Sequence, residues 1–299
     1  MRRRFVTLDV FTERRFAGNP LAVVLDADAL DTAAMQAIAR EFNYPETVFV
    51  LPAADPVHRA RLRIFTPASE LPFAGHPTVG TAVLLARLDG GTGERALVVE
   101  EVIGPVHCRA AMIDRDCGRA SFALPRLPEA LGTPADPAAA AAALSLDPAD
   151  IGFDGFRPAR WSAGLAQNFV PIRSLAAIGR ARPDPARFEA TFAIDGRAVA
   201  YLYCAEVTQA GCDFHARMFA PGLGVPEDPA TGSAAAAFAG LWTAQARRAD
   251  GEHRLRIEQG CEMGRPSLLE LTFSIADGRL AAAAIGGAAV VLTEGTIEA

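Results

Sequence analysis

The sequence has 299 residues, of which 51% are hydrophobic and 21% are charged, and its formal net charge is -6. This composition is typical of a globular protein, and the length suits one large domain or two of medium size. The negative charge argues against non-specific nucleic-acid binding, the longest apolar runs are too short to span a membrane, and Asp9 interrupts any signal-peptide core. We therefore expect a cytoplasmic protein that binds neither nucleic acid nor a membrane.

Cysteine, histidine and lysine usage narrows the possible chemistry further. The five cysteines form no CxxC pair and the five histidines are scattered, so we expect reduced thiols and no metal site. All 29 basic residues are arginine, and without lysine the chain can form neither a Schiff base nor a P-loop. Because a dinucleotide fingerprint is also absent from the sequence, we expect an enzyme that needs no cofactor.

The first half of the chain reads as strands around two helices. An alternating β-prone start is followed by a turn and a short apolar strand. Asp31 is a candidate N-cap for a helix over residues 32–42, and the Gly90–Gly91 pair would end a second helix over 77–88. Further strands are expected over residues 46–52, 59–67, 96–101, 106–112 and 119–125.

The second half begins with residues 123–152, where proline and alanine dominate. We interpret this stretch as the passage between two domains, with a short helix after Asp136–Pro137. Beyond it, helices are expected over 174–181 and 232–246, and strands over 167–172, 198–206, 214–220, 253–260, 267–275 and 279–287.

One motif occurs twice, in residues 63–82 and again in 217–234. Phe65 and Phe219 are each followed by proline two residues later, and by a further proline five residues after that. After a two-residue gap, Pro77 and Pro229 each precede glycine by three residues and open a helix. The matching spacing predicts two homologous α/β domains related by a pseudo-twofold axis.

Each copy of the motif leads from a Pro/Gly-rich loop into a helix. The N-terminus of a helix presents free backbone N–H groups and a partial positive charge, which suit a carboxylate or phosphate. If the pseudo-twofold axis brings both helix starts to the domain interface, we expect them to hold one small anionic molecule between them. Side chains from the two loops would then lie on opposite faces of that molecule, a geometry that suits proton transfer.

The chain resembles the PhzF-like family of phenazine-biosynthesis proteins, within the diaminopimelate-epimerase-like fold. The resemblance covers most of the chain, from near Leu8 to Ser267, and rests on the stretches LDVFTERRFAGNPLAVV, PETVFV, FTPASELPFAGHPTVGTA, DPATGSAAAAFAGLW and QGCEMGRPS. It implies a cofactor-independent isomerase of two domains, each with a sheet wrapped around a central helix. It also implies a homodimer.

The resemblance implies a catalytic set of Glu46, His76 and Asp228. Glu46 would be the acid–base group, assisted by the other two residues. The epimerases and racemases of this fold carry a cysteine on each loop, whereas none of the five cysteines here lies in either loop, so a two-thiol racemase is disfavoured. The family usually has a small polar residue before the glutamate, and this sequence has Pro45.

The resemblance also implies that four further residues bind substrate, namely Asn19, Gly75, Gly232 and Ser233. Each candidate has a structural alternative. A lone glutamate at the start of a strand is usually a solvated charge, and His76 before a proline can simply fix a turn. Asp228 before Pro229 is a common helix-cap arrangement. Asn19 is most often a turn residue and Arg265 most often a structural ion-pair partner, and the remaining histidines receive no role.

The sequence thus predicts an α/β (α+β) protein of two pseudo-symmetric domains. The expected N-terminal domain is 1–124, completed by 286–299, and the expected C-terminal domain is 125–285. The expected activity is that of a PhzF-type isomerase that moves a proton on a small carboxylate-bearing substrate. A lyase, hydratase or racemase using the same site, or a non-catalytic small-molecule-binding homologue, stays open as an alternative.

Overall fold

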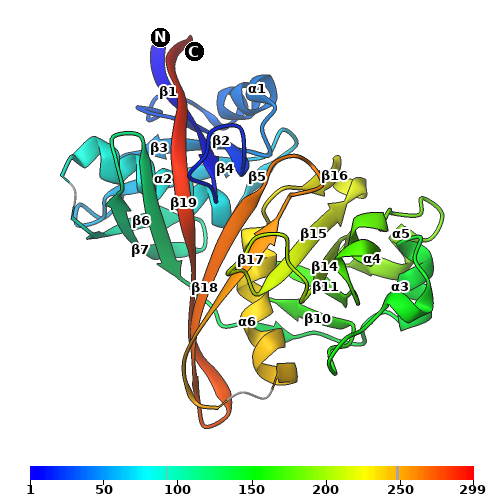
Figure 1. Cartoon of the computed structure of the whole chain (residues 1–299). Helices are drawn as coiled ribbons and strands as arrows, with labels where there is room; N and C mark the ends of the chain where they lie inside the picture. Colours follow the sequence, from blue (N-terminus) through cyan, green and yellow to red (C-terminus); the bar gives the residue numbers. More distant parts are fainter. Residues whose placement is uncertain (92, 247–248) are drawn as a thin grey trace. The chain divides into compact units, whose positions relative to one another are not determined.

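The computed structural model describes residues 1–91, 93–246 and 249–299 (Figure 1). The chain divides into two compact units, the first comprising 1–123 and 286–299 and the second 124–285. The long strand β19 (Arg279–Glu298) crosses from the second unit back into the first. Within the described residues, none of the helices combines the length and the apolar character needed to cross a membrane.

Unit 1 is a ring of strands. Going round the ring, β19 pairs with β1, and the pairing continues through β2, β3, β4, β6, β7 and β8 and returns to β19. The short strand β5 pairs with β4. The bounds are β1 Arg2–Val10, β2 Asn19–Val24, β3 Glu46–Leu51, β4 Ala60–Phe65, β5 Glu70–Leu71, β6 Arg95–Glu101, β7 Gly104–Met112 and β8 Cys117–Ala123.

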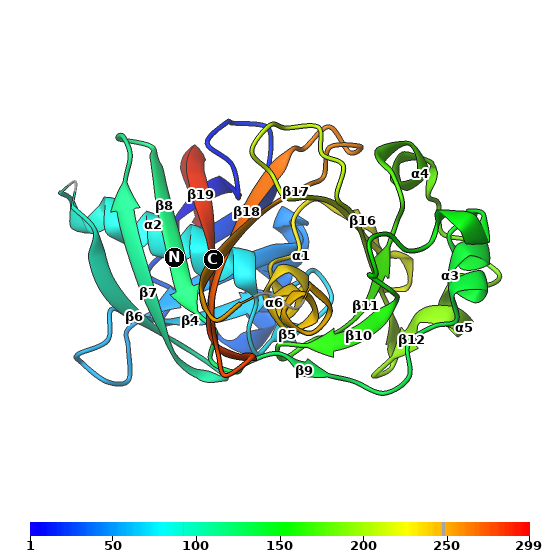
Figure 2. The ribbon, with the colours of Figure 1, turned by 60° about the horizontal axis from the view of Figure 1, so that its bottom comes forward.

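Helix α2 (Gly75–Asp89) lies among the strands of this ring (Figure 2). It is buried on every side from Gly75 to Ala86, because strands on several sides contact it. Gly80 is needed there, since a Cβ at this position would lie 2.6 Å from Leu21 and 2.7 Å from Val10. A helix that is apolar all round and enclosed by strands is a core element rather than a surface helix.

Helix α1 (Thr32–Phe42) covers the outside of unit 1. As the sequence predicts, Asp31 caps it by accepting a hydrogen bond from the Ala34 backbone N–H. Met35 and Ala39 are fully buried, and Phe42 contacts Phe5 edge-on. The helix therefore packs one apolar face onto the sheet, as its 3.6-residue periodicity indicates.

Unit 2 has the same arrangement of paired strands around a central helix. β9, β10 and β11 pair in order, β11 pairs with β14, β14 with β15, β15 with both β16 and β17, and β17 with β18. β12 and β13 form a separate small hairpin. The bounds are β9 Glu129–Ala130, β10 Ala159–Ser162, β11 Ala166–Pro171, β12 Ala193–Ile194, β13 Arg197–Ala198, β14 Ala200–Cys204, β15 Phe214–Ala220, β16 Val225–Asp228, β17 Gly251–Gln259 and β18 Ser267–Ala276.

Helix α6 (Gly232–Ala246) is the central helix of unit 2. Its buried residues are mostly alanine and glycine, with Phe238, Leu241 and Trp242 among them, and it contacts β9, β10 and β18. In Figure 2, α6 is viewed nearly along its axis beside β10. Close packing depends on the small residues, because a Cβ on Gly240 would lie 2.5 Å from the Trp161 ring.

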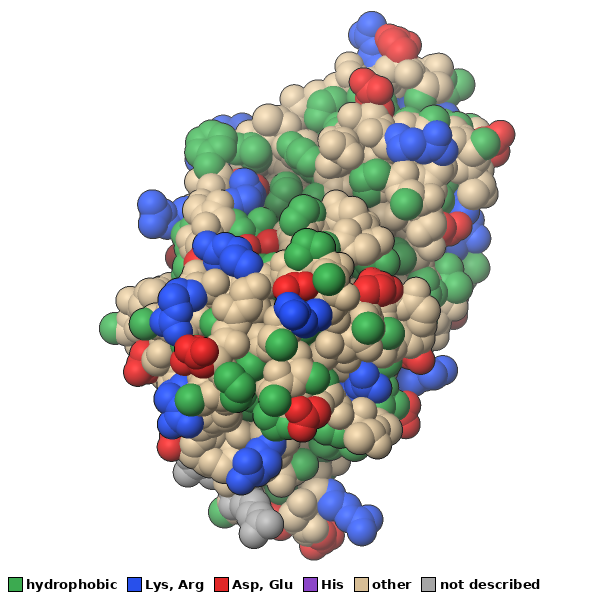
Figure 3. All heavy atoms as spheres, turned by 90° about the vertical axis from the view of Figure 1, so that its right-hand side faces the viewer, with side chains coloured by type: hydrophobic (Ala, Val, Ile, Leu, Met, Phe, Trp, Pro, Cys, Tyr) green, Lys and Arg blue, Asp and Glu red, His purple; other side chains and the backbone are tan. Residues whose placement is uncertain are grey.

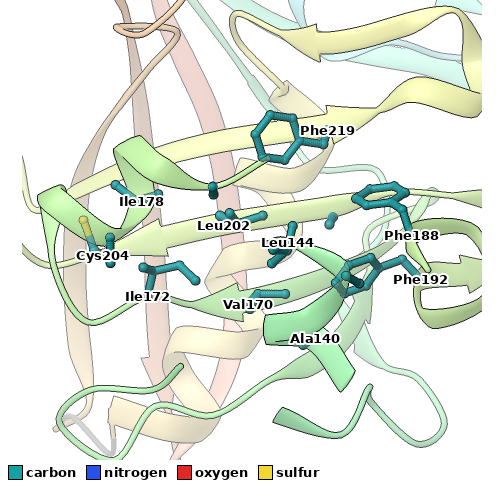
Figure 4. Close-up of a cluster of buried hydrophobic side chains, with 14 of the residues drawn as sticks. Ala140, Leu144, Val170, Ile172, Ile178, Phe188, Phe192, Leu202, Cys204 and Phe219 are labelled. Carbon is teal, nitrogen blue, oxygen red and sulfur yellow. The ribbon is translucent and has the colours of Figure 1, made fainter. Parts of the chain in front are cut away.

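Residues 123–152 begin at the boundary between the units and contain the short helix expected after Asp136–Pro137, but from residue 124 onward they belong to unit 2. Helix α3 (Pro137–Ala143), capped by Asp136, belongs to the core of unit 2. Its Ala140 and the following Leu144 are completely buried with β11, β14, β15, α4 (Leu175–Arg180) and α5 (Phe188–Phe192), as Figure 4 shows. The sequence analysis interpreted the alanine-rich stretch as a passage between domains. In the structure, its small side chains let α3 approach the sheet closely.

The two units share one pairing sequence. Through β1, β2, β3, β4, β6 and β7, successive pairs are antiparallel, parallel, antiparallel, parallel and antiparallel. Through β10, β11, β14, β15, β17 and β18 the order of pair types is identical. In each unit the central helix follows the second antiparallel pair, β3–β4 or β14–β15, and a short strand, β5 or β16. The predicted duplicated α/β architecture is therefore confirmed.

Charges on the surface are mixed rather than segregated. On the face in Figure 3, arginine and acidic side chains lie interspersed with apolar ones among the described residues. Several of the arginines form exposed ion pairs, for example Arg2 with Glu298 at 3.0 Å. Exposed pairs of this kind contribute little to stability, roughly 0–1 kcal/mol each.

Candidate active site

The Glu46 carboxyl group and the His76 imidazole are in contact in unit 1. The Nδ1 atom of His76 lies 3.0 Å from Oε2 of Glu46, and the two side chains are only 6% and 14% exposed, respectively. Glu46 is the first residue of β3, and His76 is the second residue of α2. A carboxylate and an imidazole at this distance can share and relay a proton.

Local structure explains why His76 points from a helix start. The cap position of α2 is Ala74, which makes no side-chain cap hydrogen bond, and the first backbone N–H groups of the helix have no carbonyl partner within the helix. Pro77 suits the first turn, because its missing N–H has no intrahelical partner there. The sequence placed His76 in the loop before the helix, whereas the structure places it within the first turn.

Asn19 lies on the strand beside Glu46. It is the first residue of β2 and is 1% exposed, and Leu21 two residues later is paired in parallel with Glu46. The preceding Gly18 has a φ of +66°, and a Cβ there would lie 2.3 Å from the carbonyl oxygen of Val10. Asn19 is therefore a buried strand residue held in place by a glycine turn, rather than the exposed turn residue of the structural alternative.

Asp228 belongs to unit 2 and ends strand β16. Its Oδ2 accepts a hydrogen bond of 2.6 Å from the Thr231 hydroxyl, and its carbonyl oxygen accepts one of 2.8 Å from Gln259. Since α6 begins at Gly232, the residue immediately before the helix is Thr231. Asp228 therefore lies too far before α6 to be its N-cap. Its carboxylate instead accepts a hydrogen bond from the hydroxyl of Thr231, the residue next to the helix.

Gly232 and Ser233 open α6, as Gly75 and His76 open α2. The Ser233 hydroxyl accepts a hydrogen bond of 3.3 Å from the side-chain amide of Gln167. Gln167, on β11, is 1% exposed, and its Oε1 has no hydrogen-bond partner among the described residues. Sequence reasoning assigned Gln167 only to a strand, and nothing in the local pattern AQNFVP distinguishes it from the neighbouring Asn168.

His215 is the main feature that sequence reasoning missed. Its Nδ1 lies 2.7 Å from Glu258 and its Nε2 lies 3.0 Å from Glu262, and the histidine is 1% exposed. Burial by itself lowers the pKa of His215. Hydrogen bonds with Cys261, Glu262 and Glu258 outweigh this effect and raise the pKa to about 10. The imidazole is therefore protonated and donates from both nitrogens.

Ligand atoms of His215, Glu258 and Cys261 all lie within 4.8 Å of one another. Both ring nitrogens of His215 lie within hydrogen-bond distance of carboxylate oxygens. Glu258 also accepts hydrogen bonds from the backbone N–H groups of Thr208 and Gln209. The cluster is accordingly an ion-pair network that fixes β15 to β17.

The comparisons with known proteins agree with this architecture. A family model described as phenazine biosynthesis-like protein (PhzC-PhzF) matches residues 8–295. The chain belongs to this family. As a class, the fold and the relatives together define it as an isomerase.

Individual relatives span the whole chain. An uncharacterized isomerase of Mesorhizobium japonicum is 50% identical, over 99% of this chain and 98% of its own. The trans-2,3-dihydro-3-hydroxyanthranilate isomerase of Pseudomonas aeruginosa is 35% identical, over 98% of each. The crystal structure of the PhzF-family phenazine biosynthesis protein of Bacillus anthracis superposes with a TM-score of 0.89 at 25% identity, covering 100% of both chains.

Proposed function

We propose that this chain is a cofactor-independent isomerase that moves a proton on a small carboxylate-bearing molecule, with Glu46 as the acid–base group. The observation that carries the proposal is the contact of 3.0 Å between Glu46 and His76 at the start of α2. Both side chains are largely withdrawn from water, and proton transfer needs a positioned titratable group of this kind.

The start of α2 supplies the second requirement, stabilisation of negative charge. Removing a proton beside an unsaturated or carbonyl group leaves a delocalised anion. The backbone N–H groups of Gly75 and His76 lie at the positive end of the α2 dipole, and no side-chain oxygen from the cap position occupies them. Such preorganised donors stabilise a developing anion without reorganising during the reaction.

We propose the following order of events. The Glu46 carboxylate takes a proton from a carbon of the substrate, and its acid form then returns the proton to a neighbouring carbon. The substrate changes its double-bond position but not its composition, so atoms and charge balance without an oxidant or reductant. His76 holds the Glu46 carboxyl group through the Nδ1 contact during both steps.

We propose that unit 2 contributes Asp228, Gly232 and Ser233 to the same reaction, and that Asn19 contributes to binding. The support is the resemblance in sequence, together with the similar helix starts of the two units. The substrate class follows from the relative of Pseudomonas aeruginosa, whose name specifies a cyclic amino acid with a carboxylate and ring double bonds. We propose a small unsaturated carboxylic acid as the substrate, acted on by a cytoplasmic homodimer.

Exchange of Glu46 for glutamine tests the proposal. Glu46→Gln preserves the shape of the side chain and removes only the titrating proton, so turnover of trans-2,3-dihydro-3-hydroxyanthranilate, or of another active unsaturated acid, is expected to fall by roughly 10²- to 10⁴-fold. Glu41→Gln is the matched control, since Glu41 is an exposed residue of α1. Equal turnover by the wild type and Glu46→Gln would rule out the assignment, and a product lighter by one water would identify a lyase instead.

A further inference from the structure

The internal duplication allows residues of the two units to be matched through strand register. Phe65 and Phe219 hold the same place in the repeated motif, and each ends or nearly ends its strand, β4 or β15. Five residues earlier come Ala60 and Phe214, respectively. At Ala60 and at Phe214, the strand begins its pairing with a parallel neighbouring strand.

These parallel neighbours carry two polar residues at equivalent places. Ala60 is paired with Val99 of β6, and Phe214 is paired with Ile257 of β17. Two residues further along each strand are Glu101 and Gln259, which are therefore structural counterparts. Each is the last residue of its strand.

The residues just before them confirm the match. Glu100 and Glu258 each accept hydrogen bonds from two consecutive backbone N–H groups and lie within hydrogen-bond distance of a histidine Nδ1. The partners are Ala54, Asp55 and His58 in unit 1, and Thr208, Gln209 and His215 in unit 2. Because this specific arrangement occurs in both units, the ends of β6 and β17 can be aligned residue by residue.

Glu101 holds the first turn of α2 through Thr78. The Thr78 hydroxyl lies 2.8 Å from the carbonyl oxygen of Ala74 and 2.6 Å from Oε1 of Glu101. A carbonyl oxygen only accepts, and a hydroxyl has one proton to donate. If that proton goes to Ala74, the short contact to Glu101 needs a proton from the carboxyl group itself.

The surroundings of Glu101 favour the acid form. The residue is 7% exposed, and its Oε2 has no hydrogen-bond partner among the described residues. Burial raises its pKa to about 8, against a smaller lowering by Thr78. Cys108 of β7 is the titratable group facing it from a neighbouring strand, and burial, with a lesser effect of Glu101, raises the Cys108 pKa to about 12, so the thiol is uncharged as well.

In unit 2, Gln259 holds the residues before the central helix through hydrogen bonds, and its side chain is always neutral. Its amide nitrogen donates to the Thr231 hydroxyl at 3.0 Å and to the Asp228 carbonyl at 2.8 Å, and its oxygen accepts from the Thr231 backbone N–H at 3.2 Å. The next residue, Gly260, has a φ of +76°, and a Cβ there would lie 2.7 Å from the carbonyl oxygen of Pro229. The end of β17 therefore supports the whole stretch from Asp228 to Thr231.

We propose that Glu101 and Gln259 are counterpart positioning residues, that each fixes the residues leading into a central helix through a threonine, and that Glu101 does so as a neutral carboxylic acid. Neither touches the reacting atoms. Glu101 acts on His76 through the first turn of α2, and Gln259 acts on Asp228. The link to catalysis rests on the proposed function, whereas the protonation of Glu101 and its hold on the helix do not.

The protonation state is measured on the wild-type protein without substrate. Carbon-13 NMR of the glutamate side-chain carboxyl carbons, followed through a pH titration and assigned by loss of one signal in Glu101→Gln, is expected to show Glu101 protonated at pH 6 and titrating near pH 8. A carboxyl signal that is already that of a carboxylate at pH 6 would overturn the neutral-acid assignment.

Variants of Glu101 test the positioning role. Glu101→Gln retains a neutral donor of the same shape and is expected to keep the His76 ring signals and the amide exchange rates of the first turn of α2 near those of the wild type. Glu101→Leu removes the donor and is expected to speed exchange of those amides about tenfold or more and to shift the His76 titration. Equal effects of the two variants would contradict the role.

The pH dependence of unfolding gives a second readout. Over the window from the ordinary value of 4.5 to about 8, the folded protein keeps the Glu101 proton that the unfolded chain has released. The stability that this group contributes is therefore full below pH 4.5, falls as pH rises through the window, and levels off above it. Glu101→Gln is expected to flatten this part of the curve, and an unchanged curve would contradict the proposal. Because no substrate is used, failure here is separable from failure of the Glu46 assignment.

Discussion

Single residues carry the difference between the two halves. Pro77 and Pro229 correspond in the repeated motif, so His76 and Asp228, which precede them, correspond as well. Glu46 is different. Thr47 pairs with Phe65 as Ala200 pairs with Phe219, so the counterpart of Glu46 is Val199. The chain thus has one carboxylate at the start of this strand, which suits an acid–base group that both takes and returns the proton.

Asp228→Asn separates catalysis from structure. Asparagine keeps an acceptor oxygen for the Thr231 hydroxyl, so the free energy of unfolding is expected to change by less than about 0.5 kcal/mol. If Asp228 takes part in the reaction as we propose, turnover is expected to fall at least tenfold at unchanged stability, although by less than in Glu46→Gln. Urea unfolding and steady-state kinetics on the same preparation check both values, and normal turnover would remove Asp228 from the catalytic set.

At the residue scale, the sequence predicted positions within elements where a motif carried the information. Glu46 at a strand start and His76 beside a helix start were predictable because turn residues and proline fix local geometry, whereas their roles stay predictions that rest on the family resemblance. Glu101, Gln167 and His215 were not, since their importance depends on partners from other elements. The contact of Glu101 with Thr78, or of His215 with Glu258, follows from strand register rather than from spacing along the chain.

Elements hold the site through buried charge as well as through apolar packing. Arg217 on β15 is 3% exposed and contacts Glu227 on β16 in a two-pronged ion pair of 2.8 and 2.9 Å. Arg217→Met would leave the Glu227 carboxylate partly buried without this partner. The expected loss is about 3–5 kcal/mol of unfolding free energy, measured by denaturant titration. The double variant with Glu227→Met is expected to recover much of it, and a single variant as stable as the wild type would contradict this account.

Helix α3 tests the corrected assignment of residues 123–152. Leu144, just after α3, is fully buried in the core cluster of unit 2, whereas Leu127 in the same stretch is 43% exposed. Leu144→Ala is expected to cost about 2–5 kcal/mol because it leaves a cavity. Leu127→Ala, the matched control, is expected to change stability by less than about 0.5 kcal/mol. Similar small values for both would mean that this segment is a linker after all.

Element boundaries were largely readable from the chain. The helix at 32–42 and its Asp31 cap appear as expected, and so does the strand beginning at Glu46. The strand expected at 279–287 is longer than predicted and runs on to Glu298 as β19, because the Gly286–Gly287 pair continues the strand. In the stretch 123–152 the short helix after Asp136–Pro137 was predicted, but its place in the core of unit 2 was not, since alanine permits both exposure and close packing.

The molecule as a whole is a duplicated fold whose halves have diverged. The repeated strand pairing shows the duplication, while the change from Glu46 to Val199 and from His76 to Asp228 at counterpart positions shows the divergence. This whole-chain pattern was predictable from sequence, because the motif spacing repeats. The particular division of roles was not, because it depends on how the register places each side chain.

Cofactor independence is a prediction for the whole molecule. The chain has no lysine for a Schiff base, and both ring nitrogens of His215 are already engaged by carboxylates. Treatment with a chelator followed by desalting is expected to leave turnover unchanged, and the purified protein is expected to show no flavin or pyridoxal absorbance. Turnover that is lost to the chelator and restored by a divalent cation would contradict the prediction.

The most direct test of the central claim is the fate of the solvent proton. Turnover in deuterium oxide is expected to give product with one deuterium at the carbon that receives the proton, because the protonated Glu46 carboxyl group exchanges with solvent before it returns the proton. Glu46→Gln under the same conditions is expected to form labelled product at least roughly 10²-fold more slowly than the wild type. Unlabelled product from the wild type would contradict exchange at Glu46, and labelled product formed by Glu46→Gln at the wild-type rate would show that another residue moves the proton.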